Sequence, residues 1–103
     1  MPDLPPSFDE AFDGNYVAGV LTIGTSAVVV KVGASAMVGR QEVIVFGNKT
    51  NTDTIYIGPA DVSVTTGLPV EPGEAITFTF SANIALYAIC GTAGQTARIH
   101  EVG

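Results

Sequence analysis

The sequence predicts an all-β protein, an antiparallel β-sandwich of the jelly-roll kind with about seven or eight short strands. From residue 16 onward, short runs of Val, Ile, Thr, Tyr and Phe are broken by Gly, Pro, Asn and Asp. These runs begin about every 8–12 residues, which is the spacing of a sandwich or barrel. No helical period of about ten residues follows the first segment. With 103 residues, the chain fits one domain, and we predict an N-terminal arm of residues 1–15 and a β-sandwich of residues 16–103.

The predicted arm, "MPDLPPSFDEAFDGN", differs in composition from the rest of the chain. It holds three of the six prolines and four acidic residues, and it has no Lys or Arg. One interpretation is a frayed terminus. The other is an arm that docks onto a neighbouring subunit, because leaving two phenylalanines in water is unfavourable. For that second interpretation the candidate partner-binding residues are Leu4, Pro5, Pro6, Phe8 and Phe12.

The first predicted strands are residues 16–23 and 25–32, with Gly24 between them. The second contains "AVVVKV", which is apolar on both faces except at Lys31. Such a run is typical of a strand that is covered on both sides. After the loop "GASAMVGR", residues 42–48 are expected to form the next strand.

A polar, turn-rich linker, "KTNTD" at residues 49–53, leads from residues 42–48 into residues 54–58. We expect these two strands to form an antiparallel hairpin. Gly58-Pro59 should end the second strand, because proline cannot extend a hydrogen-bonded ladder. "VSVTT", residues 62–66, is expected to be a short strand or edge segment.

The last third of the chain begins with a corner, "LPVEPGE" at residues 68–74, in which Pro72-Gly73 fits a type II turn with glycine at positive φ. "AITFTF", residues 75–80, alternates apolar and polar side chains and is predicted to be a strand. Residues 84–90 and 96–102 complete the strands. Two layers are expected to close over Ile55, Ile57, Ile76, Phe78 and Phe80.

Composition and charge restrict the possible partners. Charged residues are 14% of the chain, against about 25% in typical domains, which favours a surface partly covered by a partner or by other copies. The formal net charge is −6 with four Lys and Arg in total, so we expect no nucleic-acid binding. No apolar run approaches the roughly 18 residues of a membrane span. The acidic, proline-containing first residues do not fit a secretory signal, so we expect synthesis in the cytoplasm.

No pattern of catalytic or metal-binding residues stands out. His100 is the sole histidine and Cys90 the sole cysteine, so a Cys-cluster metal site and an internal disulfide are both excluded. Cys90 is expected to be an inert, buried thiol, and no Gly-x-Ser-x-Gly motif supports a hydrolase. We therefore expect no enzyme, no cofactor and no metal. Calcium remains an alternative because four acids lie at predicted turns, although not at EF-hand spacing: Asp53, Asp61, Glu71 and Glu74.

The sequence also bears on nucleotide and glycan binding. The glycines form neither a GxGxxG motif nor a P-loop, which disfavours nucleotides. A glycan-binding face remains an alternative, because tyrosine rings stack on sugars. The candidate aromatic residues for such a face are Tyr16, Tyr56 and Tyr87.

Five motifs follow one another in a fixed order: "EVIVFGN", "TIYIGPAD", "VTTGLPVEPGE", "ALYAIC" and "TARIHEV". Their order resembles the pattern of turns and core positions in small structural proteins of tailed bacteriophages, head decoration (cement) proteins among them. The resemblance spans about residues 21–102, and the acidic arm has no counterpart in it. It implies a non-enzymatic virion protein that forms homo-oligomers and binds the major capsid protein or another virion protein. The alternative within the same resemblance is a tail or fibre module that binds a receptor or a glycan.

Overall fold

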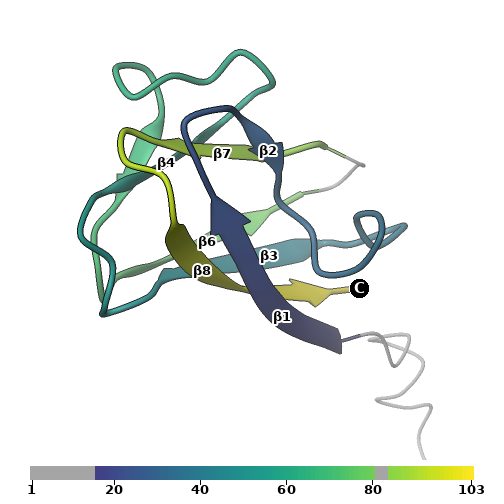
Figure 1. Cartoon of the computed structure of the whole chain (residues 1–103). Helices are drawn as coiled ribbons and strands as arrows, with labels where there is room; N and C mark the ends of the chain where they lie inside the picture. Colours follow the sequence, from purple (N-terminus) through teal and green to yellow (C-terminus); the bar gives the residue numbers. More distant parts are fainter. Residues whose placement is uncertain (1–15, 81–83) are drawn as a thin grey trace, which may run out of the picture.

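The computed structural model describes residues 16–80 and 84–103 (Figure 1). Within these ranges the chain forms eight strands and no helix. The described residues therefore contain no helix that is long and apolar enough to cross a membrane. The strands are β1 (Tyr16–Ile23), β2 (Val28–Val29), β3 (Glu42–Gly47), β4 (Ile55–Gly58), β5 (Leu68–Val70), β6 (Ala75–Thr79), β7 (Tyr87–Cys90) and β8 (Gln95–Val102).

The strands build two four-stranded antiparallel sheets, ordered β1-β8-β3-β6 and β2-β7-β4-β5. The all-β, antiparallel two-sheet fold predicted from the sequence is confirmed. Its topology follows from four antiparallel pairs, β1·β8, β2·β7, β3·β6 and β4·β5. The chain is therefore one long two-stranded ribbon, with its tip between β4 and β5, which is rolled so that successive pairs alternate between the sheets. This arrangement is the jelly roll.

At each point where the ribbon passes from one sheet to the other, its two segments cross side by side. Near β1 and β8, the Cys90 amide donates to the Gly24 carbonyl at 3.0 Å. At the middle crossing, the Val30 amide donates to the Leu86 carbonyl at 2.8 Å. At the crossing nearest the tip, the Gly73 amide donates to Gly47 at 2.8 Å. Hydrogen bonds thus accompany the ribbon through its corners, where no regular ladder exists.

The core lies between the inner faces of the two sheets. The inward positions of β8 alternate strictly and are all buried: Gln95, Ala97, Ile99 and Glu101. Among the five predicted core side chains, Ile55 and Ile57 are fully buried. Ile76, Phe78 and Phe80 pack against the core but stay half-buried, because β6 is the edge strand of its sheet.

The predicted hairpin between residues 42–48 and 54–58 is wrong. β3 pairs with β6 and β8, whereas β4 pairs with β5 and β7 in the other sheet. The linker crosses between the sheets because its side chains bind β8 instead of forming a tight turn. Asn51 donates from Nδ2 to the Thr96 carbonyl at 2.8 Å and accepts the Thr96 amide at 2.9 Å.

Other boundaries also differ from the sequence predictions. β5 (Leu68–Val70) is a strand within residues 68–74, which were predicted to be a corner. The strand expected at residues 25–32 is reduced to Val28–Val29. Residues 62–66 are a turn rather than a strand, and Ser63 is its centre: its carbonyl accepts the Thr66 amide at 3.2 Å and its hydroxyl contacts Thr65 Oγ1 at 2.9 Å. The corner at Pro72-Gly73 is confirmed, since Gly73 has φ of 85° and the Glu74 amide donates to the Glu71 carbonyl at 2.9 Å.

Candidate functional site

The described residues contain no group of three or more His, Cys, Asp or Glu side chains that could hold a metal ion. Asp53, Glu71 and Glu74 accept hydrogen bonds instead, and Asp61 is exposed. Glu71 accepts a hydrogen bond from the Thr54 hydroxyl at 2.8 Å, and Glu74 accepts the Glu71 amide at 3.0 Å. Asp53 accepts the amide of Thr54 at 2.8 Å. These contacts are those of turn-stabilising side chains.

The surface that stands out is the outward side of the β1-β8-β3-β6 sheet, called here the outer sheet face. An antiparallel sheet with one face on the core normally presents polar side chains to water on the other. Here the exposed side chains of Val20 and Tyr16 are 68% and 59% accessible, and Ile44 and Phe46 are half-buried beside them. By strand register the face consists of Tyr16, Ala18, Val20, Thr22, Glu42, Ile44, Phe46, Ala75, Thr77, Thr79, Thr96, Arg98, His100 and Val102.

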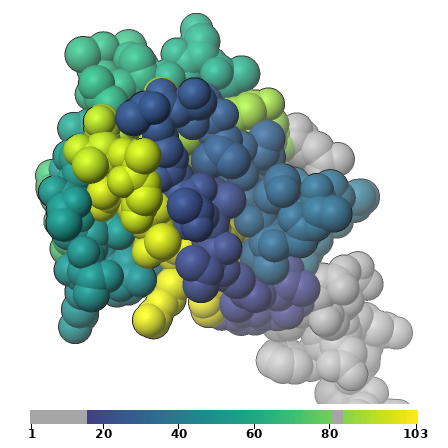
Figure 2. Space-filling view, in the orientation of Figure 1, coloured from purple at the N-terminus to yellow at the C-terminus, as the bar shows by residue number. Residues whose placement is uncertain are grey.

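Charge is sparse on this face. Its charged side chains are Glu42 and Arg98. Its other titratable side chains are His100 and Tyr16. β1 lies at the surface between the C-terminal segment in yellow and the blue segment that follows β2 (Figure 2). A sheet face with few charges and several exposed apolar side chains is suited to contact with another macromolecule.

A shallow depression of about 390 Å³ lies on the outer sheet face, between Tyr16, Phe46 and His100. The Tyr16 hydroxyl is 2.7 Å from His100 Nδ1, and the two rings meet edge to face at 5.5 Å. Arg98 places its guanidinium carbon 5.8 Å from the Phe46 ring centre, a cation–π contact. Among the described residues, its lining is aromatic and aliphatic apart from Arg98 and His100. The depression suits an apolar side chain or a ring.

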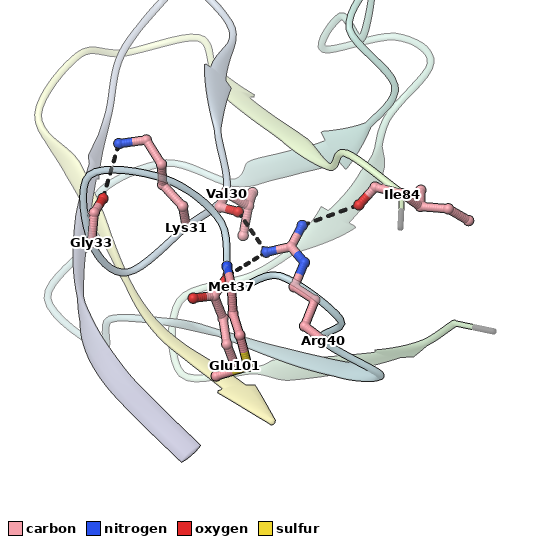
Figure 3. Close-up of polar contacts among 7 residues, drawn as sticks. All are labelled: Val30, Lys31, Gly33, Met37, Arg40, Ile84 and Glu101. Carbon is pink, nitrogen blue, oxygen red and sulfur yellow. Dashed lines mark hydrogen bonds and ion pairs between the residues drawn. The ribbon is translucent and has the colours of Figure 1, made fainter. Parts of the chain in front are cut away.

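A buried ion pair lies on the inward side of β8, where Glu101 follows His100 along the strand (Figure 3). Arg40 and Glu101 are 3% and 1% exposed, and Arg40 Nη1 donates to Glu101 Oε2 at 2.5 Å and to the Val30 carbonyl at 2.9 Å. Arg40 Nη2 donates to the Ile84 carbonyl at 3.2 Å. Glu101 also accepts the Met37 amide at 3.2 Å. Both charges are thus satisfied by groups from four separate segments.

This ion pair holds the fold together rather than forming a reactive site. Arg40 connects the end of β2 and the segment before β7 to β8, so it joins the two sheets where the ribbon crosses between them. Two open depressions of about 440 and 320 Å³ flank the loop of residues 33–39 beside the pair. Their lining is mainly small and apolar, and Glu101 and Arg40 are already bound to each other.

The candidate residues named from the sequence have different outcomes. Leu4, Pro5, Pro6, Phe8 and Phe12 lie outside the described residues, so arm docking stays a prediction. The three tyrosines do not gather on one face. Tyr16 lies on the outer sheet face, whereas Tyr56 and Tyr87 lie on the outward side of the other sheet. His100 faces outward beside the fully buried Ile99.

Cys90 is the buried thiol that the sequence predicted. It is 1% exposed, and its Sγ lies 2.9 Å from the Thr92 carbonyl oxygen. Burial raises the pKa of the Cys90 thiol above its ordinary value, and the nearby Asp53 carboxylate adds to the effect. The thiol is therefore protonated near neutral pH and is a poor nucleophile.

The sequence reasoning missed the Arg40–Glu101 pair and the apolar outer sheet face. A signal for the pair existed, because the alternation that placed Ile99 inside also places Glu101 inside. A carboxylate at an inward strand position requires a buried partner. For the outer sheet face, the signal was the apolar residues at the outward positions of "YVAGV" and "EVIVF". Considering both faces of each strand, and not only the inward one, would have identified these residues.

Comparisons with family models, curated proteins and solved structures found no match to this chain.

Proposed function

We propose that this chain is a non-enzymatic structural protein of a bacteriophage particle, a head decoration protein that binds and stabilises the assembled capsid through its outer sheet face. Its partner is the major capsid protein or another virion protein. The order of turns and core motifs, which resembles small tailed-phage structural proteins, supports the virion part of the proposal. The exposed apolar side chains of the outer sheet face support the proposed binding to the capsid.

The physical argument for binding is the amount of apolar surface left in water. Val20, Tyr16 and Leu68 are each more than half exposed in a chain of 103 residues, and the first two lie on the outer sheet face. Full burial of an apolar side chain of this size contributes roughly 1.5–3 kcal/mol. Because one copy makes only a few such contacts, its affinity is weak once the entropic cost of association is subtracted. On a capsid, however, many copies meet a repeated surface, and linked copies bind far more tightly than single ones.

The alternative is a tail or fibre module that binds a glycan. The specific observation in its favour is the depression between Tyr16, Phe46 and His100, where aromatic rings lie beside the hydrogen-bonding groups of Arg98. Aromatic surfaces next to a few polar groups are a common design for small-molecule sites. In a glycan array, binding that is lost in Tyr16→Ala would favour this function, and an array without hits would reject it.

Cryo-electron microscopy of purified particles from the phage that encodes this chain tests both functions. Repeated density for the eight-stranded sandwich on the outer surface of the head, with the β1-β8-β3-β6 sheet toward the capsid, is the expected result. Density confined to the tail or fibres would support the alternative. Particles that lack the chain, checked by mass spectrometry of the same preparation, would overturn both.

A further inference from the structure

β6 is an open edge of the β1-β8-β3-β6 sheet. It pairs with β3 on one side, and no strand among residues 16–80 and 84–103 pairs with it on the other. The inward-facing side chains show the consequence. Val45 on β3 and Ile99 on β8 are 0% exposed, whereas the equivalent Ile76 and Phe78 on β6 are half-exposed. Apolar surface that belongs to the core therefore reaches solvent along this edge.

The hydrogen bonds to β3 show which backbone groups of β6 point outward. The Phe80 amide donates to the Gln41 carbonyl and the Gly47 amide to the Glu74 carbonyl, each at 2.8 Å. In an antiparallel pair such bonding residues alternate with residues whose N–H and C=O point away. The backbone groups directed to the open edge are therefore those of Ala75, Thr77 and Thr79.

Nothing in this strand protects its edge. Natural edge strands are usually blocked by lysine, proline, a bulge or a very short length. The five residues of β6, "AITFT", contain neither a charge nor a proline. Their register with β3 is unbroken from Thr79 to Ala75, so the strand has no bulge. The edge is consequently a flat template for one more strand.

We propose that two copies of this chain pair through β6, antiparallel about a two-fold axis at Thr77, and form one continuous eight-stranded sheet. The strand is self-complementary in this register. Thr77 meets Thr77 of the partner subunit, and Ala75 meets Thr79 of the partner subunit, so all outward backbone groups bond across the axis. Ile76 meets Phe78 of the partner subunit, an aromatic–β-branched pair of the kind that stabilises sheets.

Charge placement agrees with a second copy as the occupant. In this register Glu74 stands opposite Phe80 of the partner subunit, so no carboxylate opposes another across the paired strands. A two-fold axis also gives a closed dimer rather than an open chain of subunits. Ala75, Thr77 and Thr79 also belong to the outer sheet face, but the pairing uses their backbone groups along the open edge. The proposal does not depend on the proposed function, because self-association of the chain requires no capsid.

Analytical ultracentrifugation of the full chain tests the pairing. From micromolar to submillimolar concentration, the protein is expected to shift to a species of about twice its mass of 10.6 kDa. Thr77→Lys and Thr77→Glu each place like charges opposite one another at the axis, so each variant alone should raise the dissociation constant at least about tenfold. Mixed together, the two variants should form a heterodimer, because lysine then faces glutamate.

Thr22→Lys is the matched control, since Thr22 is an exposed threonine on β1, at the other edge of the same sheet. It should dimerise like the unchanged protein. Circular dichroism would verify that all variants are folded. A wild-type chain that stays monomeric, a dimer that tolerates both charge variants, or a mixture that fails to associate would overturn the proposal. These measurements need no virus particle, so their failure is distinguishable from a failure of the proposed function.

Discussion

Glu101 is the residue at which the strand pattern and the chemistry of the side chain conflict most. Its position on β8 faces the core, where Ala97 and Ile99 are fully buried. A carboxylate there is tolerated because Arg40 and the Met37 amide bind it. Buried ion pairs contribute little net stability compared with apolar side chains, but a single unpaired member is very costly.

We therefore expect Glu101→Ala to destabilise the protein by about 3–5 kcal/mol, because it leaves the Arg40 guanidinium buried without its carboxylate. The double variant Arg40→Met with Glu101→Leu should recover most of that loss. Urea unfolding followed by circular dichroism measures both. Asp61→Asn, a change at an exposed acid, is the control and should stay within about 0.5 kcal/mol. Equal stability of Glu101→Ala and the control would contradict the role assigned to the pair.

Cys90 leads to a prediction of pH dependence. Burial raises the pKa of its thiol in the folded protein, so the folded state holds its proton more tightly than the unfolded state does. Stability from this group is complete below the unfolded pKa of about 8.5 and is lost as pH rises toward the higher folded value. The free energy of unfolding should thus fall above about pH 8.5 in the wild type relative to Cys90→Ala. The difference between the two proteins, measured by urea unfolding at several pH values, removes the contribution of other groups. A difference that is constant up to high pH would refute the prediction.

At the scale of the elements, the tip of the ribbon depends on close backbone contacts. A Cβ at Gly67 would lie 2.6 Å from Tyr56 Cβ and 2.8 Å from Val62 Cγ2. These neighbours are a strand residue and a buried side chain, so neither can move without cost. The turn between β4 and β5 therefore requires glycine at this position for space rather than for its dihedral angles.

Gly67→Ala is expected to cost about 1–3 kcal/mol, the usual range for forcing an extra carbon into a packed region. The matched control is Gly24→Ala, because a Cβ there meets nothing within 4 Å. The control should be neutral or slightly stabilising, since alanine restricts the unfolded chain. Thermal unfolding of the two variants side by side provides the comparison. Similar melting temperatures for both would show that the tip adapts to the added carbon.

Most strands could be predicted from the sequence, because alternation and turn residues are local signals. β3, β4 and β6 lie within the predicted runs, and β8 begins one residue before its predicted run. β3 and β4 are neighbours in the sequence but lie in different sheets. This separation could not be predicted from their order in the sequence. Asn51 binds the Thr96 backbone 45 residues away, and this long-range contact turns the linker into a crossing. A local pattern contains no information about such a partner.

The same limit applies to the whole molecule. Inward positions were predictable wherever a strand lies in the middle of a sheet, as for Ile55 and Ile57. They were less predictable at the edge, where Phe78 keeps part of its surface in water. Single strands could show only that some outward positions are apolar. The continuous outer sheet face exists only after β1, β8, β3 and β6 are placed next to one another. The rolled ribbon brings together outward side chains from both ends of the chain.

That surface gives the prediction that bears most directly on the proposed function. Val20 is 68% exposed on the outer sheet face, so Val20→Lys should leave folding nearly unchanged, within about 0.5 kcal/mol. A lysine at this position would require a charge to be desolvated on binding, which is costly, and we expect the apparent affinity for capsids to fall at least about tenfold. Multivalent attachment amplifies a loss of this kind.

Val64→Lys separates the effect of the face from the effect of the charge. Val64 is also exposed, at 43%, but it lies in the turn between β4 and β5 and not on the outer sheet face. Co-sedimentation of each variant with particles that lack the native protein, followed by quantification of bound chain, measures the affinity. The Val64 variant should bind like wild type, because its lysine adds the same charge but lies away from the outer sheet face. If both variants lost binding equally, net charge would be the cause. If Val20→Lys bound fully, the outer sheet face would not be the surface that contacts the capsid.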